Sequence, residues 1–89
     1  MEETISQFRN EVIVFDMATP YVCIGTLTGE DHRYYILEDA DIHDLRDSTT
    51  TRELYVLDTK KHGVGVNRSK AWVRKDDVIS LSLLSDVKE

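Results

Sequence analysis

Residues that favour β-structure come in five short runs, and these runs constrain the fold of the chain more than any other feature. Each is five to ten residues long and rich in β-branched or aromatic side chains, which favour strands. The runs cover residues 11–16, 21–28, 34–43, 70–74 and 78–84. Five strands with too few helices to cover parallel crossovers predict a small antiparallel barrel.

Three details refine the strand prediction. Gly25 lies inside the second run, where a glycine indicates a sharp bend or a β-bulge of the kind that a small barrel needs. In the last run, alternation places Ile79, Leu81 and Leu83 on one face of the strand, with serines on the other. Trp72 lies in the fourth run, and we expect it in the core or at an interface.

Residues 51–62 have the pattern of a helix. Thr50 and Glu53 have the spacing of a capping box, in which a hydroxyl and a carboxylate satisfy free amide donors at the helix start. Three positive residues fall in the last turn, where the helix dipole favours them. Gly63 can then end the helix.

Apolar side chains mark one face of each helical segment. Ile5 and Phe8, three positions apart within residues 1–9, predict a short amphipathic helix at the N-terminus. Leu54 and Leu57 have the same spacing in the second helix. We expect their face to pack on the barrel or on a neighbouring subunit.

The length of 89 residues predicts one domain, residues 1–89. Cys23 is the only cysteine, which favours a reducing compartment over a disulfide framework. The acidic start Met1-Glu2-Glu3 lacks the basic and apolar parts of a secretory signal, and no apolar run approaches the ~20 residues that span a bilayer. We therefore expect a cytoplasmic location.

The net charge of the chain is −6. Nucleic-acid binding proteins usually carry a basic surplus, because phosphate neutralisation supplies much of their affinity, so the charge disfavours RNA as a partner. The sequence has no nucleophile elbow, no phosphate-binding glycine loop and no nucleophile paired with a base. It therefore predicts a protein that is not an enzyme and has no cofactor.

Asp39, Asp41 and His43 alternate along the third run and share one strand face. Two carboxylates and an imidazole can bind a divalent cation. The other interpretation is the solvated face of a half-buried strand, and it is favoured because spacing alone, without supporting groups around the ligands, is weak evidence for a metal site. No metal site is predicted.

Two motifs resemble the signatures of the Sm-like (Sm/Lsm) family. The first is Gly25-Thr-Leu-Thr-Gly29-Glu-Asp31 with the later Leu37-Glu-Asp-Ala40, similar to the family's two glycines, leucine and aspartate ahead of an Asn and a Leu. The second is Val73-Arg-Lys-Asp-Asp-Val78, similar to an apolar-Arg-Gly-x-Asn-Val turn. The resemblance covers residues 10–45 and 70–84.

The resemblance implies a mainly β fold: a small five-stranded antiparallel Sm-like barrel with a short N-terminal helix and an inserted helix between strands 3 and 4. In this family, the fourth strand of one subunit pairs with the fifth strand of the next. The implied assembly is a closed homo-oligomeric ring of five to seven subunits. Such a ring would act as a non-enzymatic binding or scaffold module whose partner the sequence does not identify.

The alternative that the resemblance implies is a ring that binds single-stranded RNA at its central pore. The two turns that converge at the pore carry the candidate RNA-binding residues Asp31, His32, Arg33, Tyr34, Arg74 and Lys75. Arginine and tyrosine side chains can stack on bases. However, Tyr34 or Tyr35 stands where the family has its Asn, and Lys75 and Asp77 replace the family's glycine and second Asn. We therefore expect RNA binding to be weak or absent.

Overall fold

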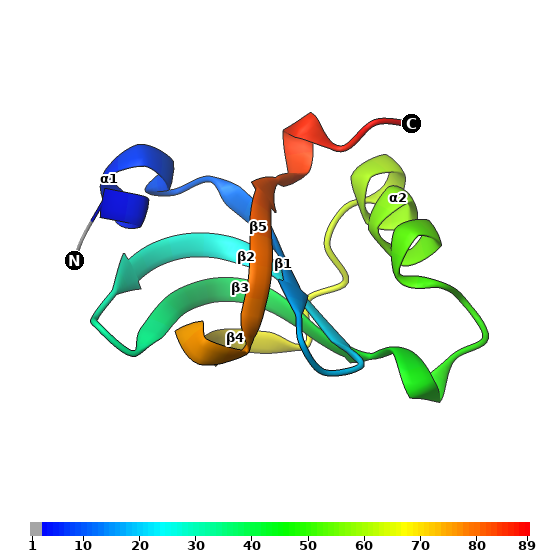
Figure 1. Cartoon of the computed structure of the whole chain (residues 1–89). Coiled ribbons are helices and arrows are strands. Elements are labelled where there is room, and N and C mark those ends of the chain that lie inside the picture. Colours follow the sequence, from blue (N-terminus) through cyan, green and yellow to red (C-terminus); the bar gives the residue numbers. More distant parts are fainter. Residues whose placement is uncertain (1–2) are drawn as a thin grey trace.

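A computed structural model describes residues 3–89 of the chain as one five-stranded antiparallel sheet with two helices (Figure 1). The elements are α1 (Glu3–Phe8), β1 (Val12–Met17), β2 (Tyr21–Glu30), β3 (Tyr34–Asp44), α2 (Arg52–His62), β4 (Arg68–Arg74) and β5 (Val78–Leu83). The prediction of five antiparallel strands, a short N-terminal helix and a helix between strands 3 and 4 is confirmed. Met1 and Glu2, which the sequence included in the first helix, lie outside the described residues.

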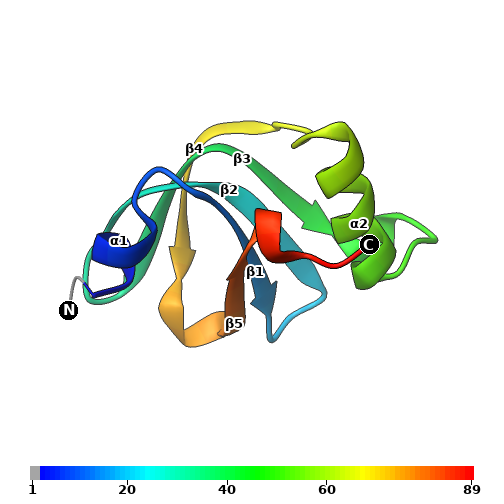
Figure 2. The ribbon, with the colours of Figure 1, turned by 90° about the horizontal axis from the view of Figure 1, so that it is seen from above.

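The strands follow the order β4-β3-β2-β1-β5, and every neighbouring pair is antiparallel. The first and last strands in this order, β4 and β5, therefore form the two edges of the sheet. The sheet is strongly bent, and the chain passes from β4 into β5 through one short turn (Figure 2). The two helices lie at opposite ends of the molecule.

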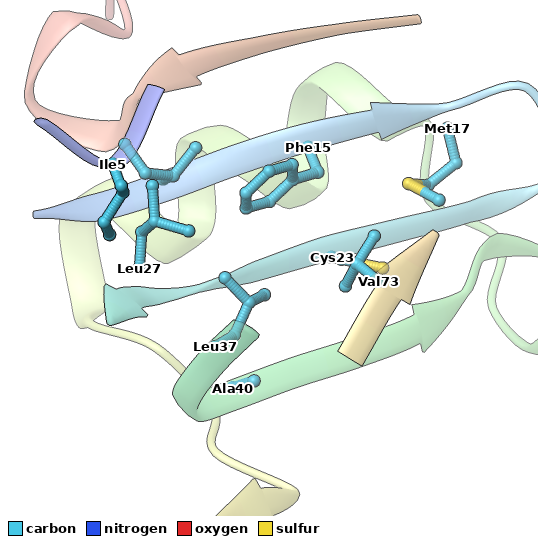
Figure 3. Packing of buried hydrophobic residues seen from close by; sticks show 9 residues of the cluster. Ile5, Phe15, Met17, Cys23, Leu27, Leu37, Ala40 and Val73 are labelled. Carbon is cyan, nitrogen blue, oxygen red and sulfur yellow. The ribbon is translucent and has the colours of Figure 1, made fainter. Parts of the chain in front are cut away.

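One face of the sheet, here called the inner face, carries the main core (Figure 3). Its buried residues are Ile5, Ile13, Phe15, Met17, Cys23, Leu27, Leu37, Ala40 and Val73. The strand residues alternate along the sequence, so the two-residue period of a strand brings them to the same face. Ile5, which belongs to α1, covers one end of this core, and Phe8 packs beside it, as their spacing predicted.

The bend predicted at Gly25 is a β-bulge between β2 and β3. The strand register shifts between Ile24 and Thr26, so that Gly25 faces two residues of β3, Asp39 and Ala40. A Cβ atom at Gly25 would lie 3.0 Å from the Ala40 Cα, which explains why glycine stands there. Asp39 takes a φ of 49°, so the extra residue of the bulge lies on β3.

The opposite face of β1 and β2, here called the outer face, is covered by α2. Val14, Val22 and Ile24 form a second buried cluster with Val56 of the helix. Of the predicted Leu54/Leu57 face, Leu57 is half-buried, whereas 55% of Leu54 is exposed and does not pack on the barrel. Packing of this face on a neighbouring subunit stays a prediction. The helix turns Val56 and Thr59 towards the sheet instead, where both are buried.

The ends of α2 differ slightly from the predicted ends. The N-cap is Thr51 rather than Thr50, and its hydroxyl accepts a hydrogen bond from the Leu54 amide at 3.2 Å. The predicted capping box is therefore out of register by one residue. Gly63 ends the helix as predicted, with a φ of 93° and an amide that donates to the Thr59 carbonyl at 2.8 Å.

The last strand departs from its predicted alternation. Leu81 and Leu83 pack against the inner core, but Ile79 is 70% exposed. The cause is a register shift between Asp16 and Met17, which leaves Ile79 without a partner on β1. Ile79 therefore lines the same outer-face hollow as Asp16.

Candidate nucleic-acid interface and assembly edges

The turn between β2 and β3 is built by Asp31. Its Oδ1 accepts hydrogen bonds from the backbone amides of Arg33 and Tyr34, both at 2.8 Å, and its own amide donates to the Tyr34 carbonyl at 3.0 Å. These amide donors favour the charged carboxylate and lower the pKa of Asp31. Asp31 thus shapes the turn and leaves the side chains of His32 and Arg33 exposed.

The two predicted pore turns lie against each other. The amide of Lys75 donates to the Arg33 carbonyl at 2.8 Å, and Tyr34 is the cross-strand partner of Arg74. Arg33, Tyr34, Arg74 and Asp76 line a hollow of about 400 Å³ between these turns. An exposed ion pair joins Arg74 to Asp76 at 3.5 Å, and a pair so open to solvent holds the arginine only weakly.

Lys75 is held inside the molecule. Its ammonium group forms an ion pair with Glu30, whose side chain is 1% exposed, and lies 4.9 Å from the centre of the Tyr35 ring. The other carboxylate oxygen of Glu30 accepts from the Ile5 amide of α1 at 2.7 Å. Glu30 therefore ties α1 to the β4–β5 turn, and its carboxylate is paired with the Lys75 ammonium group.

The six candidate RNA-binding residues thus have different surroundings. Arg33, Tyr34 and Arg74 come together around one hollow. His32 is exposed on the neighbouring turn. Asp31 and Lys75 make the internal contacts given above, which hold the two turns in place. The binding of RNA by this set stays a prediction.

A polar cluster around the buried Asp41 lies under α2, where the sequence predicted a solvated strand face. Asp41 is 2% exposed and accepts hydrogen bonds from the Tyr55 hydroxyl and from the Asn67 side-chain amide, the latter at 3.2 Å. Asn67 also binds the backbone of Ile42 through both of its side-chain atoms, at 3.0 and 3.1 Å. The His43 ring stacks on Tyr55 with 4.1 Å between centroids.

This cluster corrects the interpretation of Asp39, Asp41 and His43. The predicted alternation is right for Asp41 and His43, but α2 covers them, so their face is not solvated. Asp39 lies apart, exposed at the bulge. Within residues 3–89 no group of three or more His, Cys, Asp or Glu side chains is arranged to hold a metal ion.

Two residues of this cluster, Tyr55 and Asn67, were not singled out from the sequence. No short motif links either residue to Asp41, because Asp41 lies 14 positions from Tyr55 and 26 from Asn67. Burial raises the pKa of Tyr55, and the hydrogen bond to Asp41 and the charge of that carboxylate raise it further. The cluster fixes the helix and the chain that follows it to the outer face of β3.

The edge of β4 borders an apolar hollow of about 440 Å³, here called the seam hollow. Its walls include Met17, Tyr21, Cys23, Ile42, Ala71 and Val73. Trp72, which is 54% exposed, lies at its rim, so the expectation of a core position for this residue is wrong and an interface position stays a prediction. Burial raises the pKa of the Cys23 thiol to about 11, so the cysteine behaves as a small apolar side chain of the wall.

This bent five-stranded sheet, with α1 at its start and α2 between β3 and β4, is the Sm-like fold. The chain is similar to a solved structure described as the Pyrococcus abyssii Sm protein in complex with a uridine heptamer, with a TM-score of 0.60. The match covers 91% of this chain and 93% of that chain at 18% sequence identity. At this identity the likeness establishes the fold alone, and it confirms the fold that the two sequence motifs implied.

No protein-family model matches the sequence. No curated protein matches it either. Within residues 3–89, the structure contains no helix long and apolar enough to cross a membrane.

Proposed function

We propose that the chain is a non-enzymatic Sm-like binding or scaffold module that assembles into a closed homo-oligomeric ring of five to seven copies. The observation that carries the proposal is the strand order, which leaves β4 and β5 as free edges at the two ends of one sheet. Pairing β4 of each copy with β5 of the next uses both edges. Because the two surfaces differ, the contact is head-to-tail, and such contacts form a ring when the rotation from one copy to the next closes.

The composition of β5 supports the same assembly. A free edge presents unpaired amides and carbonyls, and proteins that leave it free protect it with proline or lysine. β5 contains neither residue. Each end of the sheet also carries one exposed apolar side chain, Trp72 on β4 and Ile79 on β5. A cytoplasmic location remains part of the proposal, with the single buried cysteine as its support.

The mass of the purified protein in solution tests the ring. Five to seven copies of the 10.3 kDa chain weigh about 52 to 72 kDa, which light scattering and native mass spectrometry separate from a single chain. We expect a mass in this range at micromolar concentration. A mass of one chain over the whole concentration range contradicts the proposal.

The second candidate function is binding of single-stranded RNA at the pore of that ring. It is favoured by the hollow between Arg33, Tyr34 and Arg74, which offers two cations and one aromatic ring. The similar Pyrococcus abyssii protein was solved with a uridine heptamer. Against it stand the net charge of −6, the internal pairing of Lys75 and the position of Asp76 beside Arg74. We therefore place the scaffold function first.

Titration of oligo-U and oligo-A at ~50 mM salt separates the two functions, because low salt strengthens phosphate contacts. The scaffold function predicts weak or no binding. Sub-micromolar affinity that falls steeply with salt and is lost in Arg74→Ala would instead establish the RNA function. Arg68→Ala is the matched control, because it removes the same charge at the other end of β4.

A further inference from the structure

We infer that Ile79 of one copy inserts into the seam hollow of the next copy and is the apolar contact that fixes the subunit interface. The inference rests on the proposed ring and names the residues that make it. Ile79 is an exposed apolar side chain on one edge strand, and the seam hollow is an apolar depression beside the other. A projecting side chain at one end of the sheet thus has a matching hollow at the other end.

The strand directions determine which faces meet across the interface. Four successive antiparallel pairs give β4 and β5 the same direction at the two ends of one sheet. For β4 of a second copy to pair antiparallel with β5, that copy must be rotated by half a turn. The rotation axis lies in the plane of the sheet and is perpendicular to the strands. The rotation exchanges its two faces, so the outer face of β5 continues into the inner face of the neighbouring β4.

This exchange of faces brings Ile79 to the hollow rather than to Trp72. Ile79 lies on the outer face of β5, where it lines a hollow together with Val14 and Asp16. The inner-face residues of β4 are Ala71 and Val73, and both line the seam hollow. A parallel pairing would preserve the faces and would place Ile79 beside the neighbouring Trp72 instead.

The charges at the two edges are complementary. β4 carries three cations and no acidic residue, whereas residues 76–86, which include β5, carry three aspartates and no cation. β5 itself is uncharged, and the three aspartates lie in the turns at its two ends. The cations of β4 and the aspartates that flank β5 favour β4 against β5 over β4 against β4 or β5 against β5. The occupant of the seam hollow is therefore a second copy of this chain, docked by its β5 edge.

Two single variants and their mixture test the inference. Ile79→Asp places a charge on the inserting side chain, and Tyr21→Asp places one in the wall of the hollow. Each variant retains one intact surface. We expect each alone to have the 10.3 kDa mass of a single chain, and the mixture to give a species of about 21 kDa, two chains, measured up to the highest soluble concentration. Formation of the mixed dimer also establishes that both variants are folded.

Val66→Asp is the matched control, because Val66 is an exposed apolar residue between α2 and β4 and lines neither surface. It should keep the wild-type mass. The inference is overturned if Ile79→Asp has the same ring mass as the wild type, or if the mixture stays at the mass of one chain. Either result leaves the ring proposal intact. A wild-type protein that is itself a single chain overturns the ring proposal first.

Discussion

The two faces of the sheet are buried in different ways. The inner face is closed by the strands themselves and is lined by apolar side chains from all five strands and α1. The outer face is closed only over β1, β2 and the end of β3, where α2 covers it, and it contains the polar cluster of Asp41, Tyr55 and Asn67. Further along the outer face, Lys70, Trp72 and Arg74 of β4 remain exposed.

The interactions that stabilise the barrel therefore differ from those that position α2. Burial of large apolar side chains contributes about 1.5–3 kcal/mol each, so the inner face supplies most of the stability. The outer face gains less from apolar contact and depends on the directional hydrogen bonds of a buried carboxylate. Such bonds are costly to leave unmade, and they fix one position of the helix.

The largest expected effect is at the inner face. Phe15 is fully buried and lies 5.2 Å from the Tyr35 ring, centre to centre. Phe15→Ala should lower the free energy of unfolding by about 3–5 kcal/mol, because it removes apolar contact and leaves a cavity. Urea unfolding at one fixed protein concentration measures the loss. Val66→Ala, which truncates an exposed apolar residue outside the inner face, should cost less than about 1 kcal/mol, and an equal loss would remove the distinction.

The next effect is at the polar cluster. Tyr55→Phe removes the hydroxyl that donates to Asp41 and leaves a buried carboxylate oxygen without that donor. The expected loss is about 1–3 kcal/mol. Tyr34→Phe is the control, because it removes a hydroxyl from a half-buried tyrosine in the turn region, and it should change stability by less than about 0.5 kcal/mol.

Alkaline pH should reduce the contribution of Tyr55 in a defined direction. The folded-state pKa of Tyr55 is raised above its ordinary value of about 10, so its contribution is complete below pH ~10 and is lost as pH rises through the folded pKa. The stability difference between wild type and Tyr55→Phe should therefore be constant at neutral pH and shrink above pH ~10. A difference that grows with alkaline pH contradicts the hydrogen bond to Asp41.

A smaller effect concerns the start of α2 on the outer face. Thr51→Ala removes the side-chain cap of the Leu54 amide and should cost about 1 kcal/mol. Thr50→Ala should cost less than about 0.5 kcal/mol, because the Thr50 hydroxyl bonds only the Thr51 carbonyl. Thermal unfolding of the two variants side by side distinguishes them. A larger loss of stability in Thr50→Ala than in Thr51→Ala would support the N-cap position that the sequence predicted.

The smallest effect lies where the outer face opens to solvent. Hydrogen bonds from the Arg46 side chain and backbone lower the pKa of Asp44 to about 2. Arg46→Ala should raise this pKa towards the ordinary value of about 3.9, measured by NMR titration. The pKa of Asp31 is the internal control, because backbone amides lower it and a distant side-chain change leaves them in place.

The inner face could be predicted from the sequence and much of the outer face could not. Strand alternation on β1 and β2, the bulge at Gly25 and the stop at Gly63 are local signals, and the structure bears them out. The burial of Asp41 depends on where α2 packs, which no local pattern encodes. The exposure of Ile79 follows from a register shift against β1, a strand more than 60 positions earlier in the chain. The sequence therefore predicted the two turns that carry the candidate RNA-binding residues, but it did not predict the exposure of Ile79.

Trp72 has a spectroscopic consequence. It is the only tryptophan of the chain, so intrinsic fluorescence excited at the red edge, where tyrosine does not absorb, comes from one point at the border of β4. Folding of a single copy leaves this indole half exposed, and its emission should stay close to that of a hydrated ring. Contact with another molecule at that edge should shift the emission to the blue. Circular dichroism then follows the folding of the strands, while fluorescence follows the edge alone, in one sample and without an added label.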